Sequence, residues 1–232
     1  LCLILQLVAI RLGSATTILV LKTSSEIVAG ADSMGAYMTG AKRISNQFCK
    51  IHPIHDFFIA SAGLYDTRAG QKLNIKELVM RVAGKGDSLS VVAKRSSDVI
   101  ASALSETLSD ARDNDGLDNV LARGNVVTFF FGFERGRPAA YVYRFSATKP
   151  EHSKAAFIDS SHEGCGPQCA PAEQDPYLIH TRSQAMEDFR SKNPALLRND
   201  PAAFVRSMIL FDIAANKDRS GPPVHMLRVD PN

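Results

Sequence analysis

The pattern of hydrophobic and polar positions predicts strands at the start of the chain. Residues 16–22 are rich in β-branched and aliphatic side chains, residues 23–25 are polar, and residues 26–32 form a second hydrophobic run. Two such runs around a short polar turn predict a β-hairpin. Gly35 and Gly40 predict that a loop follows it.

Two more strand pairs follow the same logic. Residues 49–51 and 57–63 are hydrophobic runs separated by a turn-prone segment. Residues 125–133 and 139–145 are longer runs, rich in Phe, Tyr and Val, that flank the polar segment 134–138. The second of these pairs therefore predicts another hairpin.

Helical periodicity appears between and after these strands. Apolar residues recur at helical spacing in residues 73–82 and 88–108, and Pro201 begins a further helical pattern. A shorter helix is predicted around residues 182–191, and residues 224–229 predict a final strand. Strands, two helices, strands and more helices in this order predict an α+β domain in which helices cover the sheets.

Composition narrows the function classes. The chain has 232 residues, of which 45% are hydrophobic and 22% are charged. This composition is that of a folded domain and excludes a disordered or collagen-like chain. The net charge is only +3 and the basic residues are scattered, so nucleic acid is not expected as a partner.

The first ten residues form a separate apolar segment in which Gln6 is the single polar side chain. The segment is shorter than the roughly 20 residues that span a bilayer as a helix. It has the length of the hydrophobic region of a signal peptide. Gly13 and Ala15 then stand at −3 and −1 of a cleavage site before Thr16, which is the small-x-small pattern of signal peptidase.

This pattern predicts that residues 1–15 are a signal peptide or pro-segment and that residues 16–232 form a single domain. The alternative is that the segment is a buried first strand. If the segment is a signal peptide, the protein is exported to the periplasm or the extracellular space without a stable membrane anchor. Otherwise, a cytoplasmic location is expected.

Cleavage before Thr16 would create an N-terminal threonine. Its free α-amine has a reference pKa of about 7.7–8.0, so part of it is neutral near pH 7. A neutral amine can take the hydroxyl proton, so that one residue supplies both nucleophile and base. A nearby lysine, held by a carboxylate, would favour the developing alkoxide. Asp32 and Lys50 stand where two hairpins could bring them beside Thr16, although a turn aspartate and an edge lysine would fit the same positions.

Residues 16–66 combine a Thr-rich start, a strand ending in Ala-Asp, a Gly-containing loop, Lys-Ile, and a strand ending in Ala-Gly before Asp66. In this combination they resemble the first third of a proteasome β-type subunit. The resemblance implies an N-terminal-nucleophile hydrolase with Thr16 as nucleophile and Asp32 and Lys50 as its supports. It also implies a four-layer αββα sandwich, two antiparallel sheets between helix layers, and an oxyanion donor at the backbone N–H of Gly63.

The second half of the chain matches this family less closely. Ser220 matches the serine of the family's Asp-x-x-Ser-Gly-Gly segment, and Asp218 lies one residue away from the position of its aspartate. Ala15 stands where the family has Gly, which suits signal peptidase. The family's Gly-Ser-Gly loop after Phe145 has no counterpart that we can identify.

Cys165 and Cys169 bracket a short Gly- and Pro-containing segment. In an exported protein they could form a local disulfide. A zinc site with His162 is the alternative, but it lacks a fourth ligand and a standard spacing. We therefore expect no metal and no cofactor.

Two functions fit these observations. The first is a threonine-type peptidase or amidohydrolase that acts by acyl transfer on a peptide or amide substrate and is inactive before cleavage. The second is a catalytically silent, proteasome-like assembly or binding subunit. In either case, a homo-oligomer is compatible with the resemblance.

Overall fold

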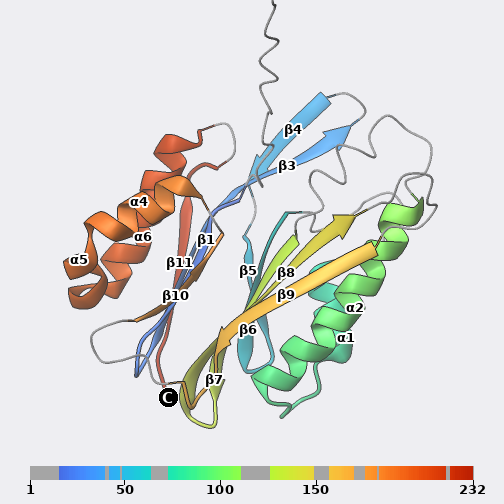
Figure 1. Ribbon diagram of the computed structural model, residues 1–232, viewed down its shortest axis with the longest axis horizontal. Coiled ribbons are helices and arrows are strands. Elements are labelled where there is room, and N and C mark those ends of the chain that lie inside the picture. The colour runs from blue at the N-terminus through green and yellow to red at the C-terminus, as the bar shows by residue number, and fades with distance from the viewer. Residues whose placement is uncertain are drawn as a thin grey trace, which may run out of the picture.

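The computed structural model describes residues 16–39, 42–47, 49–63, 73–110, 126–148, 157–169, 176–181, 183–217 and 220–231. Two antiparallel sheets lie face to face, and each is covered by helices on its outer side (Figure 1). The chain therefore has the predicted α+β, four-layer αββα architecture.

The first sheet has the strand order β10-β1-β2-β11, and the second has the order β5-β6-β7-β8-β9. The strands of the first sheet are β1 (Ile18–Lys22), β2 (Ile27–Asp32), β10 (Tyr177–His180) and β11 (Val224–Val229). Those of the second are β5 (Ile51–Ile54), β6 (Phe57–Ala62), β7 (Val126–Glu134), β8 (Arg137–Thr148) and β9 (Phe157–Cys165). A separate hairpin of β3 (Met34–Thr39) and β4 (Lys42–Gln47) projects beyond the sheets (Figure 1).

Helices form the two outer layers. The second sheet is covered by α1 (Ile75–Val82) and α2 (Leu89–Asp110), and the first by α4 (Gln184–Lys192), α5 (Pro194–Asn199) and α6 (Pro201–Ala215) (Figure 1). The buried hydrophobic residues of the described ranges accordingly form three clusters, one between the sheets and one under each helix layer.

Alternation along β1 shows how one strand serves two of these clusters. Ile18 and Val20 belong to the cluster between the sheets, whereas Leu19 and Leu21 belong to the cluster under α4 and α6. All five residues of β1 are buried. A strand covered on both faces reads as a continuous hydrophobic run, which is the pattern found at residues 16–22.

Helix α6 lies close against the first sheet because β2 carries a glycine at the point of contact. A Cβ atom added to Gly30 would lie 2.5 Å from Cδ1 of Ile209 and 2.8 Å from Cγ1 of Val205. Asp200 begins α6 as its N-cap and accepts a hydrogen bond from the N–H of Ala203 at 2.9 Å. The glycine allows the close approach of α6 to the sheet, and the cap stabilises the start of the helix.

The predicted hairpins β1–β2 and β7–β8 are confirmed, as are the helices predicted at residues 73–82, 88–108 and from Pro201. The loop expected at Gly35 is wrong, because Gly35 lies in β3, which pairs with β4 in the separate hairpin, while Gly40 lies outside the described residues. The strand predicted at residues 49–51 is displaced to β5, which runs through the segment expected to turn. The turn is confined to two residues, and His55 there takes a φ of 50°.

Candidate functional site

The predicted nucleophile, Thr16, lies just before the first strand of the first sheet. Thr16 directly precedes Thr17 and β1 and is partly buried. Thr17 directs its hydroxyl to Asp212 on α6, the side on which Leu19 also packs. Because side chains alternate along an extended chain, we infer that Thr16 points the opposite way from Thr17, toward the side on which Ile18 packs.

The structure brings the predicted Asp32 and Lys50 together. Asp32 ends β2 in the first sheet, and Lys50 directly precedes β5 in the second. The Nζ atom of Lys50 lies 2.6 Å from Oδ1 of Asp32, and the two side chains are 1% and 0% exposed. A buried ion pair therefore links the two sheets beside the start of β1.

The same carboxylate is tied to the residue that follows Thr16. Oδ1 of Asp32 accepts a hydrogen bond from the N–H of Thr17 at 2.7 Å, and the N–H of Asp32 donates to the carbonyl oxygen of Thr17 at 3.0 Å. Oδ2 of Asp32 accepts from the N–H groups of Met34 and Gly221 at 3.1 and 3.2 Å. Asp32 thus fixes the chain one residue from Thr16.

Burial controls the titration of this pair. Burial lowers the pKa of Lys50, although the charge and hydrogen bond of Asp32 act in the opposite direction. Burial likewise raises the pKa of Asp32, opposed by Lys50 and by the N–H donors of Thr17 and Gly221. Lys50 consequently releases its proton more readily than an exposed lysine would.

Gly63 lies at the same end of the second sheet as Lys50. Ile51 pairs with Ala60, so Lys50 stands opposite Ser61, and Gly63 directly follows β6 two residues further on. Its φ of 94° lies in the left-handed region that favours glycine. The exposed position leaves this turn accessible to a ligand.

Of the two C-terminal candidates, Ser220 and Asp218, the structure describes only Ser220. Ser220 is 2% exposed and donates its backbone N–H to the carbonyl oxygen of Asn216 at 3.1 Å. The next residue, Gly221, is the one that donates to Asp32, so Ser220 is placed near the ion pair. Asp218 lies outside the described residues.

Sequence reasoning missed a buried carboxylate on α6. Asp212 is 5% exposed and accepts hydrogen bonds from the hydroxyls of Thr17 and Ser183. A signal for it was present in the sequence, because Asp212 follows Met208 and Val205 at helical spacing on the apolar stripe. A charged residue on a buried stripe is rare unless it is paired.

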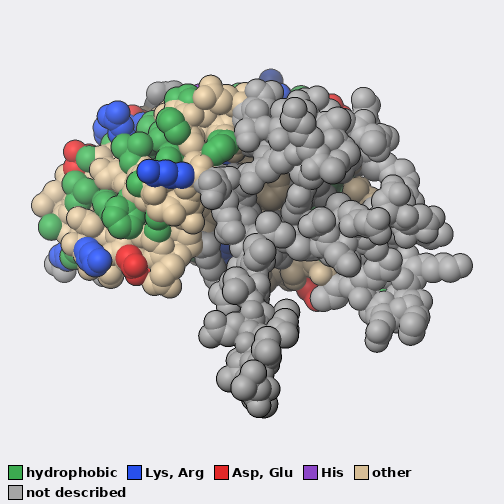
Figure 2. All heavy atoms as spheres, turned by 90° about the horizontal axis from the view of Figure 1, so that it is seen from above, with side chains coloured by type: hydrophobic (Ala, Val, Ile, Leu, Met, Phe, Trp, Pro, Cys, Tyr) green, Lys and Arg blue, Asp and Glu red, His purple; other side chains and the backbone are tan. Residues whose placement is uncertain are grey.

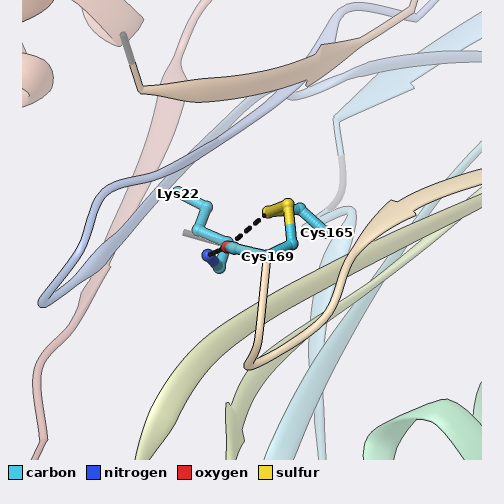
Figure 3. The surroundings of a disulfide bond; sticks show 3 residues. All are labelled: Lys22, Cys165 and Cys169. Atoms are coloured by element: carbon cyan, nitrogen blue, oxygen red, sulfur yellow. Dashed lines mark hydrogen bonds between the residues drawn. A yellow bond between two sulfur atoms is a disulfide. The ribbon is translucent and has the colours of Figure 1, made fainter. Parts of the chain in front are cut away.

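Cys165 and Cys169 form the local disulfide considered above. The side chain of Lys22 lies beside it, and its Nζ donates to the carbonyl oxygen of Cys169 at 2.7 Å (Figure 3). The zinc alternative with His162 is wrong, because the two sulfur atoms are bonded to each other and are not free as thiolate ligands. Over the described ranges, no group of three His, Cys, Asp or Glu residues could hold a metal ion.

A separate pocket of about 290 Å³ lies beside β10 and α4. Its charged and polar lining comprises Arg144, Glu163, Tyr177, His180, Glu187 and Arg190. Of the predicted site residues that the structure describes, none lines this pocket. Of the helices that the structure describes, none is long and apolar enough to cross a membrane.

Comparison with solved structures places the fold. Anbu (ancestral beta-subunit) from Yersinia bercovieri superposes with a TM-score of 0.57 at 14% sequence identity, with 93% of this chain and 81% of that chain covered. Anbu of the Pseudomonas aeruginosa helical assembly and an Anbu mutant from Hyphomicrobium sp. strain MC1 both give 0.54, at 14% and 13% identity and the same coverage. No family model and no curated protein matches the chain. The fold is therefore a proteasome-like, N-terminal-nucleophile hydrolase fold.

Proposed function

We propose that the chain is the precursor of an N-terminal threonine hydrolase, a peptidase or amidohydrolase whose nucleophile is Thr16. The observation that carries the proposal is the buried Lys50–Asp32 pair, whose carboxylate also accepts the N–H of Thr17. A buried ion pair costs much to desolvate and is weak evidence for stability alone. Because the pair contacts Thr17, the residue after the proposed nucleophile, we assign it a role in catalysis.

In the precursor, the nitrogen of Thr16 belongs to the peptide bond with Ala15 and cannot act as a base. Cleavage of that bond frees the α-amine. The neutral amine then takes the proton of the Thr16 hydroxyl while the oxygen attacks the substrate carbonyl carbon. Lys50 stabilises the developing negative charge on the attacking oxygen.

The attack converts the substrate carbonyl oxygen into an oxyanion, for which the N–H of Gly63 is the proposed donor. When the tetrahedral intermediate collapses, the amide C–N bond breaks, the leaving amine takes the proton from the α-ammonium, and an ester to Thr16 remains. Water, deprotonated by the regenerated α-amine, then attacks the ester carbon. The bond from that carbon to the Thr16 oxygen breaks, this oxygen takes the proton back from the α-ammonium, and the acid is released. No cofactor enters these steps.

The same proposal includes export, because the apolar segment and the small residues Gly13 and Ala15 form a cleavage signal that ends directly before Thr16. The Cys165–Cys169 disulfide supports it, since disulfides persist mainly in oxidising compartments. We further propose that residues 16–232 form one domain.

Self-association is part of the proposal. One of the similar structures is described as a helical assembly of the Anbu complex. In this chain, Leu210 and Phe211 on α6 are 44% and 43% exposed, and hydrophobic side chains gather on the side of the molecule that carries α4 to α6 (Figure 2). An assembly that carries no catalysis is the second candidate function, favoured by the same observation.

The proposal is tested by intact-mass measurement and N-terminal sequencing of the protein secreted by the expressing cells. We expect a mature chain that begins at Thr16. Thr16→Ala should abolish hydrolysis in a screen of N-terminally blocked fluorogenic peptides, and Thr16→Ser should retain part of it because it keeps the hydroxyl and the amine. A mature chain that retains Ala15, or equal turnover by Thr16→Ala, would contradict the proposal.

A further inference from the structure

We propose that Asp212 is a positioning residue for the nucleophile, a role that rests on the proposed function of Thr16. Its carboxylate holds the side chain of Thr17 on the α6 side of the first sheet. Because Thr16 directly precedes Thr17, this contact also restricts the orientation of Thr16. Asp212 itself does not touch the reacting atoms.

The contacts of Asp212 define the arrangement. Oδ2 accepts a hydrogen bond from Oγ1 of Thr17. Oδ1 accepts from Oγ of Ser183 at 2.5 Å and from Nδ2 of Asn216 at 2.9 Å. Asp212 is 5% exposed and Thr17 is 1% exposed, so water does not compete freely for these bonds. We call Thr17, Asp212 and Ser183 the Asp212 cluster.

The Asp212 cluster joins three elements. Ser183 is the N-cap of α4 and accepts the N–H of Met186 at 3.1 Å, Asp212 lies in α6, and Thr17 leads into β1. Helix α6 is itself fixed on the first sheet by the close contact at Gly30. The carboxylate that holds Thr17 is therefore built on rigid elements, as a positioning group requires.

Thr17 is held at several points, and this has a consequence for Thr16. The Asp32 carboxylate accepts a hydrogen bond from the backbone N–H of Thr17, and the backbone N–H of Asp32 donates to the Thr17 carbonyl oxygen. The Asp212 carboxylate accepts a hydrogen bond from the Thr17 hydroxyl. The peptide bond between Thr16 and Thr17 is planar, so fixing the N–H of Thr17 also fixes the orientation of the Thr16 carbonyl. Asp32 thus holds the backbone of Thr17, and Asp212 holds its side chain.

A hydroxyl–carboxylate contact of this kind could also serve folding alone, and the two roles predict different measurements. A purely structural role lowers the stability of the chain. A positioning role lowers the rate of the covalent step more than it weakens binding, because a displacement of about 1 Å can cost a factor of about 10² in rate.

The test measures covalent labelling of the mature protein by a peptide epoxyketone, separated into a binding constant and a maximal rate of inactivation. Asp212→Asn and Thr17→Val should each lower the maximal rate about 10- to 100-fold and leave the binding constant within a few-fold. Thr17→Ser keeps the hydroxyl and should label close to the wild-type rate. The double variant should be no slower than the slower single variant, since both remove the same contact.

Glu134→Gln is the matched control. Glu134 is another buried carboxylate, 8% exposed, that accepts hydrogen bonds from two hydroxyls, those of Ser90 and Tyr141. It ends β7 at the turn into β8, at the opposite end of the second sheet from Gly63. We expect this variant to label at the wild-type rate even if it is less stable.

A second readout does not depend on activity. Amide hydrogen exchange, followed by mass spectrometry on the peptide that begins at Thr16, should be faster in Asp212→Asn and Thr17→Val and unchanged in Glu134→Gln. If the wild-type protein exchanges as expected but is not labelled, the hydrolase proposal fails while the anchoring role stands. Wild-type labelling rates in folded Asp212→Asn and Thr17→Val, or an equal loss of rate in Glu134→Gln, would overturn the inference.

Discussion

Lys50 of the second sheet and Asp32 of the first are joined by an ion pair of 2.6 Å from which solvent is excluded. The two residues lie 18 positions apart in the sequence and on either side of the β3–β4 hairpin. The pair therefore connects the two sheets at the end where Thr16 lies, in addition to its proposed role in catalysis.

This geometry predicts a strong dependence on both partners. Lys50→Met should lower the free energy of unfolding by about 3–5 kcal/mol, because it leaves the Asp32 carboxylate buried without its counter-charge. Adding Asp32→Asn to this variant should recover part of the loss, since the remaining charge is then removed. Urea unfolding of the three proteins measures both effects.

Lys94 provides the matched control. It pairs with Asp98 at 2.8 Å on the surface of α2, where the side chains are 66% and 64% exposed. Lys94→Met should leave the unfolding midpoint unchanged within error, because exposed pairs contribute little. Equal losses at Lys50 and Lys94 would contradict the role assigned to burial.

Much of this architecture was predictable from local patterns. The β1–β2 and β7–β8 hairpins and the helices α1, α2 and α6 follow from runs and periodicities that reflect burial directly. The β9 strand was not predicted because most of its residues are exposed and its sequence is polar, so its pairing with β8 is decided by tertiary contacts. The β10 strand was missed for another reason, since it has only four residues and follows a Pro-containing segment.

The site likewise contains residues that could be predicted from the sequence and a contact that could not. Resemblance to a family located Asp32 and Lys50, and the structure brings them into contact. The contact between Thr17 and Asp212 spans 195 positions, and no local pattern links two residues so far apart. Asp212 could be suspected as a carboxylate on an apolar stripe, but its partner could not be named from the sequence.

The disulfide makes a prediction about the mature protein. Of the four cysteines, Cys2 would leave with residues 1–15 if cleavage occurs as proposed, Cys49 is free and exposed, and Cys165 and Cys169 are bonded. Iodoacetamide should therefore add one group to the denatured mature chain before reduction and three groups after it. Three groups without reduction would show that the disulfide does not form.

Removal of this disulfide should have a moderate effect on stability. Replacing Cys165 and Cys169 by Ser should lower the free energy of unfolding by about 2 kcal/mol, the value expected for a closed loop of about five residues. The hydrogen bond from Lys22 to the Cys169 carbonyl oxygen holds the loop in the oxidised protein. Thermal unfolding of the double Ser variant tests the effect, and a melting temperature equal to that of the wild type would contradict it.

His180 should make stability depend on pH. Its ring is buried, with Nδ1 2.9 Å from the carbonyl oxygen of Thr181 and Nε2 3.3 Å from Glu187. Burial lowers the pKa of His180, and the charges of Arg144 and Arg190 act in the same direction, against Thr181 and Glu187.

The unfolded chain therefore binds a proton at His180 from about pH 6.5 downward, before the folded chain does. The free energy of unfolding should fall as the pH drops below about 6.5 and level off below the folded-state pKa. In His180→Asn, the loss between pH 7.5 and pH 5.5 should be smaller than in the wild type, as measured by urea unfolding at each pH. An equal or larger loss in the variant would contradict the assignment.

Covalent labelling at Thr16 shows whether this residue acts as the nucleophile. A peptide epoxyketone closes its ring only on a residue that offers both a hydroxyl and a free α-amine. Mass spectrometry of the mature protein after digestion should show the probe's mass on the peptide that begins at Thr16, and no adduct should form in Thr16→Ala. Correctly processed, folded protein that remains unlabelled at Thr16 would contradict the hydrolase account and favour the assembly subunit without catalysis.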